Sequence, residues 1–384
     1  GKGIIVNLHK NGDRSDPGNF RGITLFSCLE KVFSTIMNNR LSVFLKNRDV
    51  IAKNQRGFQK KARTSDHLFI IRTLMDKYVR KENTSLYICF VDFSKAYDSI
   101  WHLGLFLKML RNGIRGKFYS VVKDLYQKSE SCVKMTQGRS DFFRCMSGVK
   151  QGEPLSPALF NLYVNDLSKK LDMVAESPSL GPELVSHLLW ADDLVILSTS
   201  SRSLQNKLDV LTQFCQEWKL NVNVKKTKVM KLSKSGRLPK ENFYITNSKV
   251  DAVTQYKYLG VVIAASGTFS YARHNIAQRA KKAMFKLKSC IGYGAILPSL
   301  GLKMFDQVVA PVCMYGSEIW SLDNLDKSKK FERQDGLQEF FHELPIEKVN
   351  LSFCKYLLGV NKKSGNLAVR AELGRLPLGV RVVC

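Results

Sequence analysis

The sequence lacks the features that mark a membrane protein, a zinc ribbon or a repeat protein. Its 384 residues contain no apolar run of about 18 residues, so we expect no membrane span. None of its nine cysteines forms a C-x-x-C pair, and their wide spacing favours free thiols in a reducing, intracellular compartment. There is no internal repeat and no long low-complexity linker, so the segments are expected to pack together. Because the chain opens on Gly1 without a charged-then-apolar leader, we expect a fragment of a longer reading frame without a signal peptide.

Acidic residues are also scarce. Asp and Glu number 33 against 60 Lys and Arg, which gives a formal net charge of +27 and a pI near 9.7. Such a field attracts polyanions, and nucleic acid is the commonest large one. A basic surface that serves solubility alone is the weaker alternative. Charge by itself does not separate an enzyme from a binding protein.

The sequence does contain several apolar runs of strand length. Residues 86–91 form a continuous apolar run of strand length that ends at Asp92, which predicts a buried strand. Residues 188–191 and 194–197 flank two acids, which predicts a hairpin with Asp192 and Asp193 at its tip. A second hairpin is predicted over 129–149 with Gln137 and Gly138 as its turn, and a further strand over 256–263.

Helical spacing is equally clear in several segments. Helices are predicted over 101–126, 154–171 and 204–220. Another helix is predicted after the basic 55–63 loop, with Leu68, Ile71, Leu74 and Met75 on one side. An earlier helix is expected to bury one face, formed by Leu29, Val32, Phe33, Ile36 and Leu41. From residue 276 onward the chain is expected to be rich in helices, beginning with a basic helix that groups Arg279, Lys282 and Lys286 on one face. The order strand–helix–strand–strand–helix–strand between 86 and 232 resembles a split βαβ unit.

The carboxylates at Asp92, Asp192 and Asp193 admit two interpretations. Carboxylates next to buried strands are costly to ionise unless a cation compensates, and Mg²⁺ prefers such oxygen ligands. Two such ions would stabilise the attacking and leaving oxygens of a phosphoryl transfer. Alternatively, each acid is an ordinary cap or turn residue, which is the commoner role of a single aspartate.

The surrounding motifs favour the first interpretation. Residues 90–102 (FVDFSKAYDSIWH), 147–157 (SGVKQGEPLSP), 190–193 (WADD), 220–228 (LNVNVKKTK) and 256–260 (YKYLG) resemble, in order and spacing, the motifs of reverse transcriptases of non-LTR (LINE-type) retrotransposons and group II introns. The stretches 19–25, 55–58, 63–66, 315–320 and 353–360 also resemble the same family, so nearly the whole chain is covered.

The resemblance implies an α+β fold of the right-hand polymerase kind. Fingers are expected over 1–85, a palm with a split βαβ antiparallel sheet over 86–264 with a fingers-side insertion around 103–146, and a helical thumb and post-thumb region over 265–384. The implied activity is RNA-directed DNA synthesis, a nucleotidyl transfer with two Mg²⁺ ions as cofactors, for which Mn²⁺ could substitute. The implied partners are an RNA template, a DNA primer and dNTPs, and a nuclear site of action follows from the family.

The resemblance also implies roles for individual residues. Asp92 and Asp192 would bind both metals, with Asp193 as a weaker or supporting ligand. Tyr97 would stand against the sugar and select deoxynucleotides, since the 2′-OH is the handle that separates the two sugars. The other nucleotide-binding residues would be Arg21, Lys10, Phe93, Gln151, Gly152 and Lys226. The template–primer duplex would contact Tyr258, Leu259, Gly260, Arg279, Lys282 and Lys286.

Two other functions remain open at this stage. One is a non-catalytic relic with a polymerase fold that only binds nucleic acid. The other is an RNA-dependent RNA polymerase, against which Tyr97 and the 151–156 box (QGEPLS) argue. Trp190 departs from the Phe or Tyr that the family usually places before Ala-Asp-Asp, and a bulkier ring there could lower activity. No endonuclease segment and no zinc knuckle is visible in this chain.

Overall fold

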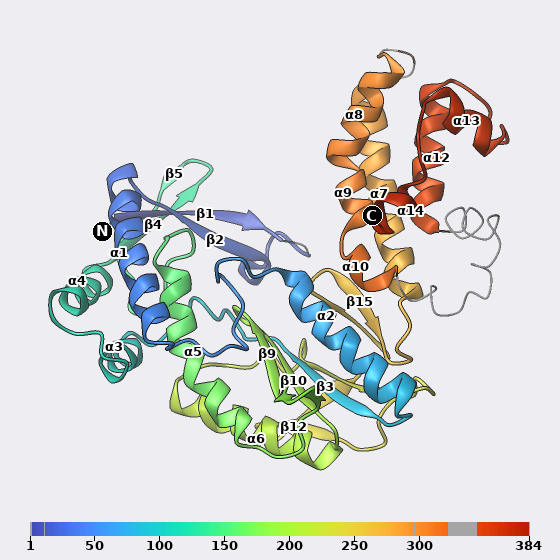
Figure 1. Ribbon diagram of the computed structural model, residues 1–384. Coiled ribbons are helices and arrows are strands. Elements are labelled where there is room, and N and C mark those ends of the chain that lie inside the picture. The colour runs from blue at the N-terminus through green and yellow to red at the C-terminus, as the bar shows by residue number, and fades with distance from the viewer. Residues whose placement is uncertain (1, 11, 293, 295, 322–343, 384) are drawn as a thin grey trace. The chain divides into compact units, whose positions relative to one another are not determined.

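Apolar runs and amphipathic stretches alternate along the chain, and the structure, a computed structural model, folds them into a mixture of helices and sheets (Figure 1). It describes residues 2–10, 12–292, 294, 296–321 and 344–383. The predicted α+β class is confirmed. The chain forms two compact units, the first made of Gly1–Arg63, Leu86–Met230 and Pro239–Ala252, and the second of Thr64–Ser85, Lys231–Leu238 and Val253–Cys384. The boundaries given for fingers, palm and thumb stay predictions.

In its described residues, the first unit contains two larger sheets, a small two-stranded sheet and several helices. Its elements are β1 (Lys2–His9), η1 (Pro17–Asn19), β2 (Phe20–Leu25), α1 (Cys28–Asn47), β3 (Leu86–Val91), α3 (His102–Arg111), α4 (Gly116–Gln127), β4 (Glu130–Met135), β5 (Gly138–Arg139), β6 (Phe143–Arg144), α5 (Ser156–Asp172), β7 (Ser179–Leu180), β8 (Glu183–Leu184), β9 (His187–Trp190), β10 (Asp193–Ser198), α6 (Ser201–Glu217), β11 (Lys228–Leu232), β12 (Phe243–Ile245) and β13 (Ser248–Ala252).

The central sheet has the strand order β12-β13-β11-β3-β10-β9. Strand β3 is buried at all six positions, as its apolar run predicts, and β10 pairs antiparallel with both β3 and β9. Side chains of α5 and α6 share one hydrophobic core with those of β3 and β10. Figure 1 shows these two helices next to the sheet. This core fixes the end of β3, where Asp92 follows, against the β9–β10 hairpin.

The second sheet has the order β2-β1-β4-β5, with β6 also paired to β4. Strand β1 runs antiparallel to β2 and parallel to β4. The predicted hairpin over 129–149 is present, but Met135 pairs with Gly138, so the turn is Thr136–Gln137 rather than Gln137–Gly138. The tip of the β9–β10 hairpin is likewise one residue earlier than predicted, because Asp193 already pairs with Trp190.

The predicted buried face of α1 is wrong in most positions. Leu29, Val32, Phe33 and Ile36 are exposed, and the buried stripe is Ser34, Met37, Leu41 and Leu45. The reason is a polar contact that apolar spacing does not reveal. The hydroxyl of Ser34 donates to Glu153 Oε1 (3.3 Å) and accepts the backbone N–H of Leu155 (3.3 Å). This pair of hydrogen bonds turns the serine inward and rotates the apolar residues of the first turns outward.

In its described residues, the second unit contains one two-stranded sheet and the end of β11, together with helices. Its elements are α2 (Thr64–Leu74), the π-helical turn η2 (Met75–Lys81), β14 (Gln255–Tyr258), β15 (Val261–Ala264), α7 (Ser270–Ile291), α8 (Pro298–Val308), α9 (Ala310–Met314), α10 (Ser317–Trp320), α12 (Pro345–Leu357), α13 (Asn366–Glu372) and α14 (Leu378–Val383). The stretch 256–263, predicted as one strand, is a hairpin whose turn is Leu259–Gly260. The buried face of α7 includes Ile276, Ala280, Met284 and Leu287.

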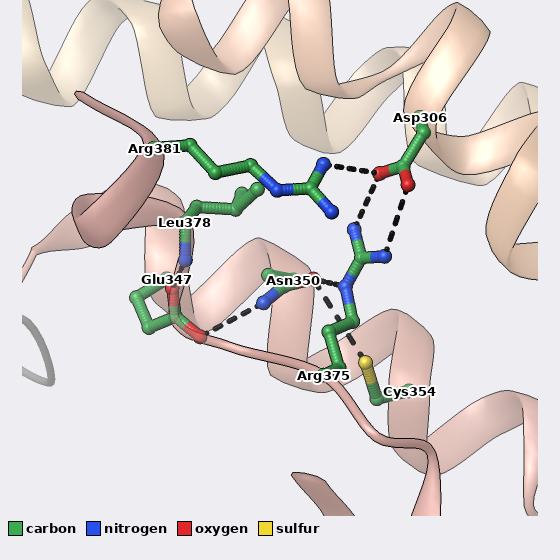
Figure 2. Close-up of polar contacts among 7 residues, drawn as sticks. All are labelled: Asp306, Glu347, Asn350, Cys354, Arg375, Leu378 and Arg381. Atoms are coloured by element: carbon green, nitrogen blue, oxygen red, sulfur yellow. Dashed lines mark hydrogen bonds and ion pairs between the residues drawn. The ribbon is translucent and has the colours of Figure 1, made fainter. Parts of the chain in front are cut away.

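Helices near the C-terminus are tied together by a buried polar network (Figure 2). The guanidinium of Arg375 donates to both carboxylate oxygens of Asp306 on α8 and to Asn350 Oδ1 on α12, the latter at 2.7 Å. Arg381 on α14 also reaches Asp306, at 3.2 Å. Although burial opposes it, these two arginines hold the pKa of Asp306 below its usual range. One charged network therefore joins α8, α12 and the segment that leads into α14.

The same network contains a fully buried glutamate. One oxygen of Glu347 accepts hydrogen bonds from Arg370 (2.7 Å) and Asn350 (2.9 Å), and the other accepts the backbone N–H of Leu378 (2.7 Å). Figure 2 shows the Asn350 and Leu378 contacts converging on Glu347. Buried charges are tolerated when they are paired and hydrogen-bonded in this way.

Across the described residues, no helix is long and apolar enough to cross a membrane.

Candidate active site

Three acids meet at one end of the central sheet. Leu194 of β10 lies opposite Val91 of β3, and the same antiparallel register extended by one residue places Asp193 opposite Asp92. Asp192 immediately precedes β10. Burial and then the charge of Asp92 raise the pKa of Asp192, against the effect of nearby cations. Burial, followed by the charges of Asp192 and Asp92, raises the pKa of Asp193 to about 6, although the residue remains exposed. Acids distant in sequence are therefore close enough to repel one another.

The position of Asp92 is fixed by the segment that follows α6. Its backbone N–H donates to Thr227 Oγ1 (3.1 Å), and its carbonyl accepts the N–H of Asn223 (2.7 Å). The next residue, Phe93, forms an antiparallel bridge with Val222. The 220–228 motif, which the sequence singled out without a role for most of its residues, thus clamps the end of β3.

The turn that carries Asp192 is held by a residue that sequence analysis did not assign. The side chain of Gln55 is almost fully buried, and its Oε1 accepts the backbone N–H of Ala191 (3.1 Å) and of Gly57 (2.9 Å). Ala191 has a φ of 56°, a conformation unusual for alanine. Gly57 packs so closely against this turn that a Cβ there would lie 2.2 Å from the nitrogen of Ala191. The 55–58 motif (QRGF) resembled the family's, but only the structure shows that it holds the turn at Ala191.

A groove of about 1170 Å³ adjoins the acids within the first unit. Asp92 and Asp192 line it, whereas Asp193 does not belong to its wall. The lining includes all seven residues predicted to bind nucleotide, which are Lys10, Arg21, Phe93, Tyr97, Gln151, Gly152 and Lys226. Residues as far apart in the sequence as Lys10 and Lys226 therefore line the same groove.

Cationic side chains from the β1–β2 hairpin line the groove. Arg21 and Lys10 both act to lower the pKa of Asp192, which places their charges near that carboxylate. The backbone N–H of Lys10 donates to the carbonyl of Asn19 (2.9 Å) and closes the loop that carries it. Lys226 is exposed on the same groove. This arrangement opposes cationic side chains to acidic ones across a space that could hold a polyphosphate.

Tyr97 lies on the groove wall with its ring stacked on Phe160 of α5, at a centroid distance of 4.6 Å and an interplanar angle of 8°. Its hydroxyl is buried and has no hydrogen-bond partner among the described residues. Burial, and then the charge of Asp192, raise the pKa of Tyr97, so the phenol stays neutral. Phe93 also lines the groove but, unlike Tyr97, is itself buried.

The 147–157 motif closes another side of the groove. The carbonyl of Gln151 accepts the N–H of Thr24 on β2 (2.8 Å), and its side-chain amide donates to Asp98 (3.2 Å). Gly152 has a φ of 106°, and a Cβ at this position would lie 2.8 Å from the carbonyl oxygen of Thr24. Glycine is needed here for both conformation and space.

The predicted duplex-binding residues lie in the second unit. The turn Leu259–Gly260 is supported by Tyr315, whose hydroxyl donates to the carbonyl of Leu259 (2.8 Å), and by Arg279, which donates to the carbonyl of Gly260 (3.2 Å). Tyr258 is buried, with its hydroxyl 3.1 Å from His67 Nδ1. Arg279 and Tyr258 thus have contacts within the protein, and a direct role in binding nucleic acid remains a prediction for them.

The remaining two lysines of that set are differently placed. Lys282 and Lys286 are exposed on α7, on the side away from its buried stripe. They stay candidate phosphate contacts, and of the basic face predicted on α7 they are the part that is open to solvent.

Asp92, Asp192 and Asp193 are the candidate ligands of a metal ion. No three His, Cys, Asp or Glu side chains in the described ranges are gathered into a ready-made metal cluster. Mg²⁺, however, usually takes one or two protein carboxylates and completes its shell with water and substrate phosphates. Asp92 and Asp192, which face the groove, fit that donor set. Burial, and then the charges of neighbouring acids, raise the pKa values of Asp192 and Asp193. A bound divalent cation would relieve the repulsion between these charges.

Comparison with known proteins agrees with this geometry. A family model described as reverse transcriptase (RNA-dependent DNA polymerase) matches residues 8–263, more than half of the chain. The chain belongs to the reverse transcriptase family. The match covers the acids, the groove and the turn at Leu259–Gly260, and it confirms the resemblance that the sequence motifs carried.

Relatives of this reverse transcriptase domain come from retrotransposons. It is 25% identical over 332 residues to the probable RNA-directed DNA polymerase from transposon BS of Drosophila melanogaster, covering 83% of this chain and 35% of that protein. It is 26% identical over 329 residues to the polymerase from the mobile element jockey of the same species, with the same coverage. It is 25% identical over 321 residues to the Pol polyprotein of the type-1 element R2 of Popillia japonica, covering 80% and 43%. Kinship with non-LTR elements is confirmed, and the chain spans less than half the length of these relatives.

A solved structure shows the same fold. Apo telomerase of Candida tropicalis superposes with a TM-score of 0.50 at 12% sequence identity, covering 97% of this chain and 68% of that one. At that identity the likeness concerns the fold alone. It agrees with the predicted right-hand polymerase class.

Proposed function

We propose that this chain is the polymerase part of a non-LTR retrotransposon protein and copies RNA into DNA. The observation that carries the proposal is the convergence of Asp92 and Asp192 on a cation-lined groove. In the proposed reaction, the 3′ oxygen of a primer forms a bond to the α-phosphorus of a dNTP, and the bond to pyrophosphate breaks. An RNA template, a DNA primer and dNTPs are the proposed partners.

The side chains divide the work by their positions. Arg21 and Lys10 would neutralise the triphosphate, for which a planar guanidinium offers two parallel hydrogen bonds. Gln151 and Gly152 would support the forming base pair from the opposite wall, with the backbone of Gly152 in close approach. Lys226 would contact the leaving pyrophosphate from the loop after α6.

Membership of the family implies dependence on a divalent cation, and Mg²⁺ is our proposal for its identity. Asp92 and Asp192 would hold it, and Asp193 would add negative charge beside them. When bound, such ions stabilise the attacking and leaving oxygens of an in-line displacement. The carboxylates themselves must be ionised, which the raised pKa values of Asp192 and Asp193 make harder at acidic pH.

Choice of sugar is proposed to rest on Tyr97. Its ring is held flat against Phe160 and cannot tilt away without losing that stack. A ring fixed beside the sugar would collide with a 2′-hydroxyl. Tyr97→Val should therefore admit ribonucleotides, whereas Tyr97→Phe should keep the selection for deoxynucleotides. Equal discrimination by all three proteins would contradict this role and reopen the RNA polymerase alternative.

The decisive experiment is extension of oligo(dT) on poly(rA) with Mg²⁺, comparing the wild-type chain with Asp192→Ala. The wild type should incorporate dTTP, Asp192→Ala should not, and Mn²⁺ should support synthesis in place of Mg²⁺. Equal incorporation by both proteins would remove the catalytic assignment. No incorporation by either would favour a relic that only binds nucleic acid. A nuclear site of action is part of the proposal, because a retroelement must reach the genome, and fluorescent tagging in cells would test it.

A further inference from the structure

Phe58 is an exposed aromatic side chain on the wall of the groove. Its side chain is 60% exposed, although the groove that it lines also contains Asp192. Its neighbours Arg56, Lys60 and Lys61 are exposed and basic. A large apolar ring in water gains nothing for folding, since the hydrophobic effect rewards only area removed from solvent.

The backbone at Phe58 is also unfavourable for such a residue. The N–H of Gln59 donates to the carbonyl of Arg56 (3.2 Å), which makes Phe58 the third residue of a β-turn. Its φ of 60° lies in the left-handed region, where that turn position favours glycine or asparagine. A bulky residue with positive φ is a genuine outlier, and such outliers cluster at functional sites.

The surroundings hold the ring in this exposed position. Gly57, the residue before it, is pressed against Ala191, and its carbonyl accepts a hydrogen bond from Asn161 Nδ2 (2.8 Å). Its N–H is bound by the buried Gln55, the same side chain that holds the catalytic turn. Phe58 therefore extends from a rigid support that is shared with Asp192.

The chemistry of the groove indicates what covers the ring. Aromatic side chains among basic ones form stacking platforms for the bases of single strands, because every base has a π-face. Bases inside a duplex are already stacked, so only an unpaired base can offer its face. In template-directed synthesis the unpaired strand at the active site is the template ahead of the primer end. Resting on the proposed function, we propose that Phe58 stacks on an unpaired template base next to the nascent pair.

Two substitutions at one position separate stacking from folding. Phe58→Gly removes the ring and relieves the positive φ, so thermal stability should be unchanged or higher. Phe58→Trp keeps a platform and adds a fluorophore. Binding of a fluorescent RNA template–DNA primer with a five-nucleotide template overhang, measured by anisotropy without dNTP, should weaken roughly 5- to 150-fold in Phe58→Gly and stay near wild type in Phe58→Trp. Phe69→Ala, which removes a comparably exposed ring from α2 and not from the groove, is the matched control and should bind normally.

The position of the base is tested by abasic sites in the overhang. One abasic position should weaken binding to the wild-type chain but have no further effect on Phe58→Gly, because the contact is already gone. Unchanged affinity in Phe58→Gly, or equal abasic effects on both proteins, would overturn the inference. A chain that shows this coupling without extending primers would refute the polymerase proposal alone, and an active chain without the coupling would refute the role of Phe58 alone.

Discussion

Replacing Asp193 with asparagine should make the protein more stable while impairing catalysis. Its pKa is raised from 3.8 to about 6, by burial first and by Asp192 and Asp92 second. For a fully buried carboxyl group, a pKa difference of this size would correspond to roughly 3 kcal/mol of folding free energy. Because Asp193 remains exposed, solvent screening reduces the gain to about 1 kcal/mol, or about 2 °C in Tm. The asparagine keeps the shape of the side chain and removes one of three mutually repelling charges.

The sign of the pH dependence follows from the direction of the shift. Between pH 3.8 and about 6 the folded state binds more protons at Asp193 than the unfolded state. Stability of the wild type therefore falls as pH rises through this window, and the charged acid remains unfavourable above it. Asp193→Asn should match the wild type near pH 4 and exceed it above pH 6.

Thermal melts at pH 4, 5, 6 and 7.5, with and without Mg²⁺, provide the assay. Mg²⁺ should raise the Tm of the wild type at pH 7.5 and raise that of Asp193→Asn less, because the variant has less repulsion to relieve. Asp141→Asn, an exposed aspartate away from the groove, serves as the control and should shift neither curve. A stability difference that is the same at every pH, or a less stable Asp193→Asn at pH 7.5, would refute the reasoning.

Three further predictions concern buried polar side chains. Burial lowers the pKa of the fully buried Lys108 to about 8. The stability of the wild type relative to Lys108→Met, measured by urea unfolding, should therefore rise by roughly 2 kcal/mol between pH 7.5 and 9.5. A difference that stays constant with pH would contradict this prediction. Glu347→Gln removes the carboxylate charge that faces Arg370 and should cost about 3–5 kcal/mol by the same method, where a loss below 1 kcal/mol would show that the pair is not needed. Gln55→Ala should slow single-turnover primer extension at saturating template–primer about 10-fold or more, since the residue holds the turn at Ala191 and a misplacement of about 1 Å is enough for such a loss; an unchanged rate would count against that role.

The parts of the site that the sequence could predict are those whose chemistry is visible in residue type. Asp92 follows an unbroken apolar run, and the strand it closes is buried at every position. Asp192 lies between two apolar stretches, and the hairpin is present to within one residue. Lys10, Arg21 and Tyr97 were taken from the family's pattern, and each lines the groove. Family motifs and strand periodicity are local signals, so one sequence is enough to read them.

The parts it could not predict depend on partners far away in the chain. Ser34 is buried in α1 because Glu153 and the N–H of Leu155 bind its hydroxyl, which no helical spacing could indicate. Gln55 is polar and lies in a basic loop, a pattern typical of a solvated segment. It is buried because both ends of its amide are used by the turn at Ala191, 136 positions later. Polar residues that satisfy a distant backbone give no signal in composition or periodicity.

The unfavourable features of the first unit gather around this one glutamine. Ala191 and Phe58 both have positive φ, and the acids beside them repel one another, as the raised pKa of Asp193 shows. Each of these features would relax if the chain were free, so a rigid element must oppose all of them. The buried core of β3, β10, α5 and α6 supplies that rigidity. Gln55 holds the turns at Ala191 and Phe58 in place by accepting the backbone N–H groups of Ala191 and Gly57. Backbone strain and charge repulsion are expected to concentrate where a site is preorganised for its ligands. Here the proposed ligands are a divalent cation at the acids and an unpaired base on Phe58.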